Sequence, residues 1–427
     1  DVLRKVPGII KKGEDLEVIG RGKPVFYING RKVYDNDELK RLLSDEIASV
    51  EVITNPGAMY DATVTAVVRI KTVRRQGDGF SFNTFAKTEQ SLRTGLNDPE
   101  AQVNVNYRHK GLDVFASAKE WQYRTNQWSD LGQTTTDIST GTEIFRYEGA
   151  LKHQWRGIGT HLTGGFNWQI NDKHSVGAKV DYAISTKVDT KERLAMNKYE
   201  RGTLIESVCS DGHNWSDKPN NTLVNAYYNG SIGKLTIDFN ADLFFTNDNT
   251  HQLMKETANT TDRDIESVTT SKNNMAATKL VLAYPIWKGM LNIGTEETFI
   301  ERDNTNNSQG TGLPNSTSKV NDKTYAAFIQ YGVALNAKTQ ASLGLRYEHA
   351  DFDYKDMLNP ADNMERSYDN IFPSASISTL IGKTRIALAY SSRTQRPSLG
   401  QLNNSMMYHN RFVVQQGNPK LKPSIEN

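Results

Sequence analysis

The sequence predicts a mostly β protein, in which a large antiparallel transmembrane β-barrel follows a small α/β unit. About thirteen stretches between Phe80 and Arg393 alternate apolar and polar residues, as strands with one apolar and one wet face do. The gaps between these stretches are alternately short and long. This is the arrangement of turns and loops in a transmembrane barrel, and it is the second observation that predicts the fold.

Four stretches show the alternation most clearly. They are Ala101–His109, His174–Ser185, Lys234–Thr246 and Thr324–Leu335. In Lys234–Thr246 every second residue from Leu235 to Phe245 is apolar, and those between them are mainly Thr, Asp and Asn. These stretches reach or approach the roughly 9–11 residues that a tilted strand needs to cross the hydrocarbon core. We therefore expect the apolar side chains to face lipid and the polar ones to face a lumen.

The connections fall into two length classes. Short turns are expected at 110–111, 171–173, 230–234, 286–289, 336–338 and 382–383. After a modest connection at 90–100, long loops rich in Asn, Thr, Asp and Ser are expected at 125–157, 187–220, 247–271, 301–321 and 353–369. A large soluble all-β protein, such as a propeller or an adhesin, is the alternative. It fits less well, because its sheets would usually need cover on both faces.

The composition agrees with a barrel. The chain has 427 residues and a mean hydropathy of -0.61. It has no run of eighteen apolar residues, which excludes a helical membrane protein. A net charge of +2 gives no indication of a nucleic-acid partner. The single cysteine, Cys209, cannot form an internal disulfide. Asp1–Gly13 lacks a secretory signal, so we expect that processing removed one or that the chain begins inside a longer protein.

The first ~76 residues predict a small α/β unit by the same reasoning from strand and turn signals. Strands are expected at Glu17–Ile19, Pro24–Asn29, Ser49–Ile53 and Val64–Val73, with a tight turn at Asn29-Gly30. A short helix capped by Asp35 or Asn36 is expected to bury Leu39, Leu42 and Leu43 against that sheet.

Three segments of this unit carry a family resemblance. Asp1–Gly8, Tyr27–Arg31 and Ile47–Ala62 resemble the plug domain of TonB-dependent outer-membrane receptors. The run Asn-Pro-Gly-Ala-Met-Tyr-Asp-Ala at 55–62 is similar to the outer-membrane β-barrel proteins of the Bacteroidetes type. Near the other end, Gln416–Pro423 resembles a loop motif within the barrel of that family.

The resemblance implies a fold and a domain division. Such receptors hold an N-terminal plug inside the lumen of a 22-stranded barrel. It implies a plug over residues 1–76, incomplete at its N-terminus, and a barrel over residues 77–427, incomplete at its C-terminus. The energy-coupling segment expected before the plug is not present, and the chain is expected to be part of a longer receptor.

The resemblance also implies a function in the outer membrane of a Gram-negative bacterium. This is active, TonB-energised uptake of a scarce or large nutrient: an iron chelate, cobalamin, a glycan or a peptide. The implied partners are the inner-membrane TonB complex, through a segment not in this chain, outer-membrane lipid, the nutrient, and in one branch a surface lipoprotein. The alternative is a structural or adhesive outer-membrane barrel without energised transport.

Motifs for chemistry are scarce. The histidines are scattered, and Gly382–Thr384 lacks the earlier glycine of a phosphate-binding loop. No serine-hydrolase elbow is present. We therefore expect no enzymatic activity, no catalytic residue, no metal and no cofactor.

Four residues are candidate ligand contacts. Arg21 and Lys23 lie in a glycine-containing turn of the plug-like unit and can meet an anionic group. Trp128 and Trp215 are expected in long loops, where an indole can stack on a sugar ring or a flat chelate.

Other residues have predicted structural roles. Trp121, Tyr123 and Trp155 are expected to form the aromatic girdle at the membrane interface. The alternative for these three is also to stack on a sugar ring or a flat chelate. Asn55–Asp61 is expected to turn the chain and pack against the barrel wall. Lumen-facing charges are expected to hold the plug by reversible polar contacts: Lys179, Asp181, Asp238, Asp242, Arg346 and Glu348.

Overall fold

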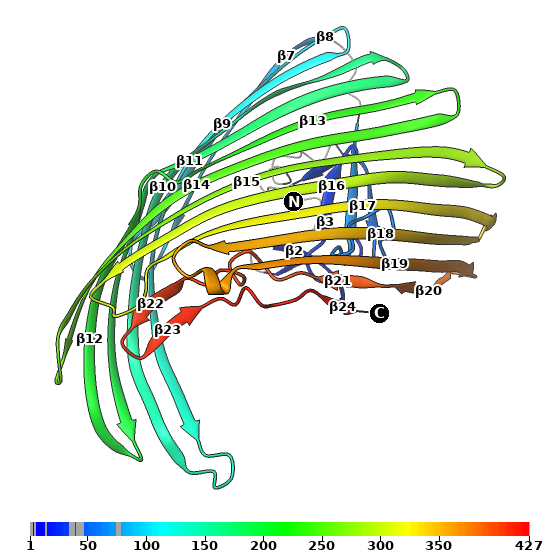
Figure 1. Ribbon diagram of the computed structural model, residues 1–427. Coiled ribbons are helices and arrows are strands. Elements are labelled where there is room, and N and C mark those ends of the chain that lie inside the picture. The colour runs from blue at the N-terminus through cyan, green and yellow to red at the C-terminus, as the bar shows by residue number, and fades with distance from the viewer. Residues whose placement is uncertain are drawn as a thin grey trace.

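One large curved antiparallel sheet dominates the computed structural model, which describes residues 3, 6–12, 15–33, 39, 47–73 and 78–426 (Figure 1). Its strands are β7 (Gly79–Gln90), β8 (Asn97–His109), β9 (Leu112–Thr136), β10 (Glu143–Asn171), β11 (His174–Glu200), β12 (Thr203–Ser216), β13 (Asn220–Ile232), β14 (Leu235–Ala258), β15 (Arg263–Ile286), β16 (Gly289–Gln309), β17 (Ser316–Asn336), β18 (Thr339–Asp356), β19 (Met364–Ile381) and β20 (Thr384–Ser391). Each strand pairs with its neighbours in sequence, except around β12 and β13.

Strands β12 and β13 occupy a single position in the sheet. Strand β12 pairs with residues 188–200 of β11 and 250–258 of β14. Strand β13 pairs with the other ends of the same two strands, residues 174–184 and 235–247. The sheet of the described residues therefore has thirteen strand positions, as the alternation predicts. Strands β7 and β20 form its two edges, so the sheet is open.

The two faces of the sheet differ as predicted. On β14, Phe239, Leu243 and Phe245 are 37%, 44% and 43% exposed, while Asp242 between them is 7% exposed. We call the face that carries the three apolar side chains the outer face, and the face that carries Asp242 the inner face. An uncovered apolar face of this extent needs lipid around it, which confirms the prediction of a transmembrane barrel sheet.

The predicted short turns are confirmed, but the predicted long loops are wrong. Strand β9 continues to Thr136 and β10 begins at Glu143, so only residues 137–142 connect them. Residues 259–262 likewise join β14 to β15. Above the membrane both faces of a hairpin are wet, so its strands pair without alternating apolar and polar residues. Alternation therefore cannot detect these extensions.

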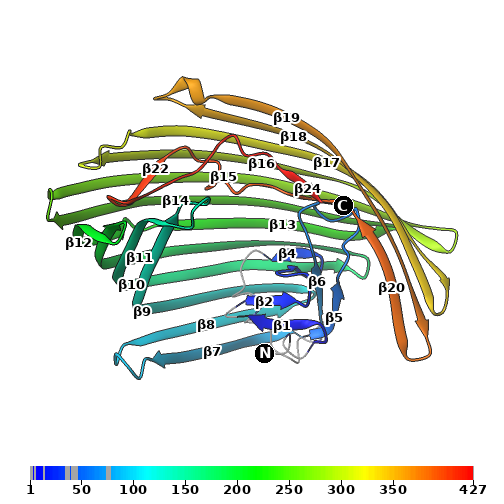
Figure 2. The same ribbon diagram turned by 90° about the horizontal axis from the view of Figure 1, so that it is seen from below.

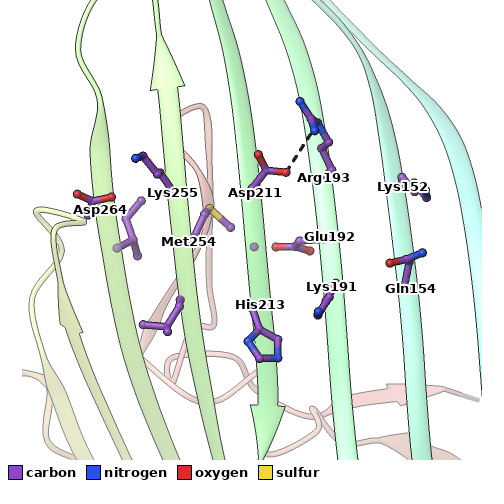
Figure 3. A pocket seen from close by; sticks show the side chains of 13 residues that line it. Lys152, Gln154, Lys191, Glu192, Arg193, Asp211, His213, Met254, Lys255 and Asp264 are labelled. Atoms are coloured by element: carbon purple, nitrogen blue, oxygen red, sulfur yellow. Dashed lines mark ion pairs between the residues drawn. The ribbon is translucent and has the colours of Figure 1, made fainter.

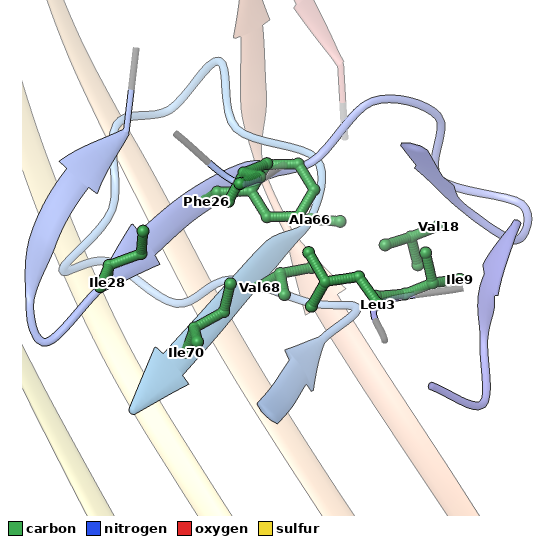
Figure 4. Close-up of a cluster of buried hydrophobic side chains, with 9 residues drawn as sticks. Leu3, Ile9, Val18, Phe26, Ile28, Ala66, Val68 and Ile70 are labelled. Atoms are coloured by element: carbon green, nitrogen blue, oxygen red, sulfur yellow. The ribbon is translucent and has the colours of Figure 1, made fainter. Parts of the chain in front are cut away.

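The described residues of the N-terminal unit, which spans residues 3–73, form two small sheets. Strands β1 (Ile9–Lys12) and β2 (Asp15–Val18) form one sheet; β3 (Val25–Ile28), β4 (Arg31–Val33), β5 (Ile47–Ile53) and β6 (Val67–Thr72) form the other. Strands β2, β3, β5 and β6 confirm the predicted ones, whereas β1 was not predicted. Its core includes Val18, Phe26, Val68 and Ile70, as Figure 4 shows.

Of the residues in the predicted helix of this unit, the structure describes only Leu39. Leu39 has helical backbone geometry and is buried in the same core. Leu42, Leu43 and the proposed caps Asp35 and Asn36 lie outside the described residues. Within the described part of the chain, no helix has both the length and the apolar character needed to span a bilayer.

Residues 392–426, which we call the inner segment, leave β20 and return along the inner face of the sheet (Figure 1). Here β21 (Arg393–Gln395) pairs with β24 (Ser424–Glu426), and β22 (Met406–Asn410) forms a hairpin with β23 (Val413–Gln416). A short 3-10 turn, η3 (Pro360–Asp362), lies between β18 and β19. Figure 2 shows the N-terminal unit and the inner segment on the same side of the curved sheet.

Candidate functional site

A buried cluster of charges joins the N-terminal unit to the sheet and to the inner segment. Asp61 lies 3.8 Å from Arg346 on β18 and 3.6 Å from Arg396 of the inner segment. Arg346 donates to Glu348 at 2.6 Å and to Glu296 at 3.1 Å, and Arg396 also contacts Glu348. Arg346 and Glu348 are each only 1% exposed. The carboxylate of Asp61 is therefore the point where three parts of the chain meet.

The charge state of Asp61 follows from these neighbours. Burial by itself raises the pKa of this carboxyl. The attraction of Arg396 and Arg346, with hydrogen bonds from Thr63, outweighs burial and holds the pKa of Asp61 well below its usual range. Asp61 is therefore ionised at neutral and mildly acidic pH.

Backbone groups of the adjoining loop also contact the sheet. Lys279 donates to the carbonyl oxygen of Met59 at 2.6 Å, and the Met59 amide donates to Gln330 at 3.3 Å. Ala58 packs against Val281 and Phe328 in a small apolar cluster. The predicted packing of Asn55–Asp61 against the barrel wall is thus confirmed.

Close approach at this contact depends on a glycine in the sheet. A Cβ on Gly344 would lie 2.8 Å from the Cβ of Ala58, closer than real Cβ atoms come. The loop therefore rests directly on the backbone of β18. Beside this contact, a cavity of about 410 Å³ remains between the N-terminal unit and the sheet, with Tyr60, Asp238 and Lys279 among its lining residues.

The predicted plug-contact residues all lie on the inner face, but their contacts differ. Arg346 forms an ion pair with Asp61, and Glu348 acts through Arg346 and Arg396. Asp238 faces the Asn29-Gly30 turn, because a Cβ on Gly30 would be 3.1 Å from its carboxylate.

The other three predicted contact residues bond to neighbours on the sheet. Lys179 pairs with Asp181 at 2.6 Å, and Asp242 accepts from Asn225 at 2.6 Å. Lys179 also lines a second cavity of about 510 Å³, whose other side includes Asn29 of the N-terminal unit. A direct role for Lys179, Asp181 and Asp242 in holding that unit stays a prediction.

Arg21 and Lys23 form bonds within the N-terminal unit. Arg21 donates to Asn55 at 2.7 Å, and Lys23 pairs with Asp15 at 3.1 Å. Lys23 is 60% exposed, so this pair adds little stability. The structure does not bring these two cations together with Trp128 or Trp215, and their role in ligand contact stays a prediction.

Trp128 and Trp215 lie in strands, so their predicted placement in loops is wrong. Trp128 is on the β9 extension beneath the guanidinium of Arg93, 4.8 Å from the ring centroid. Trp215 is on β12 and stacks on His251, with centroids 4.9 Å apart. Neither residue lines a cavity described here, and ligand contact by them stays a prediction.

The girdle prediction for Trp121, Tyr123 and Trp155 is wrong. In the β9–β10 pairing these residues lie opposite Gly159, Gly157 and Thr125, on the face that carries Lys119 and Thr163. That is the inner face. These aromatics lie near the ends of the alternating stretches, where the sequence does not show which face of the sheet a side chain is on.

The inner segment is the main element that sequence reasoning missed. The Tyr408 hydroxyl donates to Glu256 at 2.8 Å, and Arg411 donates to Glu256 at 3.2 Å and to Glu206 at 2.8 Å. Glu256 is fully buried. Arg366 on β19 holds the far end through the carbonyl oxygens of Pro419 and Leu421. The motif at Gln416–Pro423 was the one signal in the sequence that marked this segment.

A larger cavity of about 1060 Å³ lies between the inner segment and the inner face of the sheet. We call it the outer cavity, although it does not lie on the outer face. Its lining includes Trp121 on β9, Arg302 and Asn304 on β16, and Gln401 and Asn418 of the inner segment.

A further hollow of about 620 Å³ lies in the strand extensions (Figure 3). It is lined by charges of both signs, including the pair Arg193 and Asp211, 3.7 Å apart. No group of three or more His, Cys, Asp or Glu among the described residues could hold a metal ion.

Comparison with known proteins agrees with this architecture. Residues 231–427, from the end of β13 through the inner segment, match the family model described as "Outer membrane protein beta-barrel family". No curated protein matches the chain significantly in sequence.

Three solved structures share the fold. The copper transporter OprC aligns with a TM-score of 0.60 and 11% identity over 99% of this chain and 64% of its own. The siderophore receptor PiuA from Acinetobacter baumannii gives 0.52 and 11%, over 91% and 60%. The Serratia marcescens hemophore receptor HasR, solved with its hemophore HasA and heme, gives 0.51 and 12%, over 99% and 64%.

These findings define the class of protein. The chain has the fold of the TonB-dependent outer-membrane receptors, and its residues 231–427 match an outer-membrane β-barrel family. It spans less than two thirds of the length of the solved structures. The more specific resemblance to the Bacteroidetes type stays a prediction.

Proposed function

We propose that this chain is part of a receptor that imports a scarce or large nutrient across the outer membrane with energy from the TonB complex. The observation that carries the proposal is the position of the N-terminal unit. It lies on the inner face of a barrel sheet and is held there through Asp61 by Arg346 and Arg396. A unit in that position acts as a plug of the lumen.

The nature of the contact supports a movable plug. Ion pairs and hydrogen bonds to Asp61 and Met59 dominate it, and Ala58 supplies a small apolar patch. Water can replace polar contacts when the unit moves, whereas a broad apolar interface would have to be exposed. Transport needs such a bistable contact, since a ligand shifts a unit only between states of similar free energy.

The open sheet supports a longer working protein. The free edges of β7 and β20 would leave backbone groups unpaired in lipid, at several kcal/mol for each group. We propose that residues 1–76 are the plug, that residues 77–427 are part of the barrel, and that further strands close it.

The cargo is proposed at the level of class. The solved structures with this fold are named for a copper transporter, a siderophore receptor and a hemophore receptor. An iron chelate, cobalamin, a glycan or a peptide fits a plugged receptor of this kind. We assign transport rather than catalysis to the chain, with the TonB complex, the nutrient and a surface lipoprotein as the proposed partners.

Growth of the source bacterium tests the proposal. The probes are ferric citrate or haemin as iron source, cyanocobalamin as cobalamin source, and neutral oligosaccharides or a peptide mixture as carbon source. Deleting the gene for this protein should abolish growth on at least one probe. Deleting TonB should abolish the same growth, and the double deletion should add nothing.

The alternative function gives a different result. A structural or adhesive barrel predicts that the gene deletion leaves growth on every probe unchanged while adhesion or envelope integrity falls. Growth that needs the gene but not TonB would contradict energised uptake.

A further inference from the structure

Two aromatic rings form a flat platform on the inner face of the sheet. The rings of Trp121 and Tyr123 are nearly parallel, with centroids 5.6 Å apart and planes at 15°. Each ring lies over a glycine of β10. A Cβ on Gly159 would be 2.2 Å from the Trp121 ring, and one on Gly157 would be 2.3 Å from the Tyr123 ring. The two glycines therefore let the rings lie against the backbone of β10.

The platform borders the outer cavity. Trp121 is one of its lining residues and is partly exposed. The rings are backed by the sheet on one side, so the lumen can meet the other side. An aromatic face carries partial negative charge and attracts the positive C–H edges of a flat ligand.

The rest of the lining is polar but almost uncharged. Of its twenty-nine residues, nineteen are Asn, Gln, Ser or Thr, and Asp248 and Arg302 are the ionisable ones. Amide and hydroxyl groups both donate and accept hydrogen bonds. They match a ligand whose own groups do both.

Two buried donors at the cavity have no partner. The side-chain nitrogen of Asn304, a residue only 4% exposed, makes no hydrogen bond within the described structure, and neither does Nε of Arg302. Buried polar atoms are usually satisfied, and an unpaired one costs about 1–3 kcal/mol. A ligand with acceptor oxygens in the cavity would satisfy both, provided that a small turn of the two side chains brings the nitrogens to the cavity surface.

These features favour one ligand chemistry over others. An anionic metal chelate would call for a cluster of cations, whereas Arg302 is the single cation in the lining and Asp248 adds a negative charge. A peptide strand is usually recognised by backbone pairing at a sheet edge. The lining strands from β9 to β16 are interior strands, and the only described edges at the cavity belong to the short hairpin of β22 and β23. Sugar hydroxyls both donate and accept, and sugar rings present C–H groups to an aromatic face.

We propose that the outer cavity binds a neutral oligosaccharide, with one sugar ring stacked on Trp121 and hydroxyl oxygens accepting from Asn304 and Arg302. This inference rests on the proposed uptake function and names its cargo class. The inner segment supplies the floor of the site. It is tightly built there, since a Cβ on Gly417 would be 2.3 Å from the carbonyl oxygen of Asn403.

Binding by the complete purified receptor tests the inference. The receptor is first screened on a glycan array of neutral oligosaccharides, and any binder is then titrated by tryptophan fluorescence. Haemin, ferric citrate and a peptide library are measured in parallel. Wild type should bind at least one neutral oligosaccharide. Trp121→Ala and Asn304→Leu should each weaken that binding tenfold or more, and Gly159→Ala should weaken it by displacing the indole.

A matched control lies three residues along the same strand. Asn307 is exposed and lies on the outer face, so Asn307→Leu should leave binding unchanged. Failure of every neutral oligosaccharide to bind wild type, or binding that Trp121→Ala and Asn304→Leu leave intact, overturns the inference. Binding of haemin or of a peptide instead would overturn this inference and leave the proposed uptake standing. Oligosaccharide binding in a protein whose gene and TonB prove dispensable for growth would keep this inference and contradict energised uptake.

Discussion

The guanidinium of Arg346 lies 3.8 Å from the carboxylate of Asp61 and thereby ties a sheet strand to the N-terminal unit. The same guanidinium is bonded to Glu296 and Glu348. Arg346 is thus shared between three carboxylates while almost completely buried. Such a group is costly to leave unpaired and is stable only while its partners stay in place.

Replacing this arginine should loosen the N-terminal unit. Arg346→Gln leaves Glu348 buried with one fewer cation, which should lower the free energy of unfolding by about 3–5 kcal/mol. Hydrogen exchange of residues 57–64 should become faster. Arg193→Gln is the control, because Arg193 and Asp211 form a pair that is 67% and 61% exposed. That change should alter stability by less than about 0.5 kcal/mol, as surface substitutions do.

The contact should resist mild acid. The pKa of Asp61 is lowered relative to the unfolded chain, where a carboxyl titrates near 3.9. A lowered pKa stabilises the folded contact above that ordinary value, and the stabilisation is lost only as the pH falls through the lowered pKa. Protease protection of residues 57–64 should be the same at pH 7 and pH 4.5. Release between pH 6 and 5 would argue against Asp61 as the anchoring charge.

A methyl group added at Gly344 on β18 should push the N-terminal unit away from the sheet. In Gly344→Ala the new Cβ would meet the Cβ of Ala58 at 2.8 Å, and overpacking of this kind costs about 1–3 kcal/mol. Gly332→Ala is a matched control on β17, since its Cβ would meet nothing within 4 Å. Thermal unfolding should separate the two variants. Ala58→Gly should rescue the first in part, because the new Cβ would also lie 2.8 Å from Oγ of Ser374 on β19. Equal melting temperatures would show that the loop does not rest on Gly344.

Weakening the contacts of Tyr408 and Arg411 with Glu256 should release the inner segment from the sheet. The side chain of Arg411 is 5% exposed and therefore protected from trypsin. Tyr408→Phe removes one hydrogen bond to Glu256 and should cost about 1–2 kcal/mol. Glu256→Gln weakens both anchors and should allow faster cleavage after Arg411. Burial, with the hydrogen bond to Glu256, raises the pKa of Tyr408 to about 12, so this anchor should persist in moderate alkali.

The sequence revealed the fold where the membrane imposes a pattern. Phe239 and Asp242 could be assigned to opposite faces, because lipid on one side and water on the other force alternation. Residues such as Thr134 in the β9 extension have water on both sides, so no alternation marks them. The same loss of pattern hid the orientation of Trp121.

The candidate site was less accessible from the sequence. Alternation placed Arg346 on the inner face, but its pairing with Asp61 joins distant parts of the chain and depends on how the N-terminal unit sits. The role of Arg396 depends on the inner segment, whose strands are short and whose course follows from tertiary contacts. Local sequence carries no information about such contacts.

A reversible crosslink between the N-terminal unit and the sheet tests the central claim most directly. The variant is Ala58→Cys with Gly344→Cys, in a Cys209→Ser background so that these 427 residues carry no other thiol. Cβ atoms joined by a disulfide lie about 3.8 Å apart, and this pair is close enough to react after a small shift. Uptake of the nutrient that supports gene-dependent growth is then measured before and after oxidation. The account predicts that the crosslink forms in cells, stops uptake when oxidised and allows it again after reduction. Undiminished uptake by the fully crosslinked protein would contradict it.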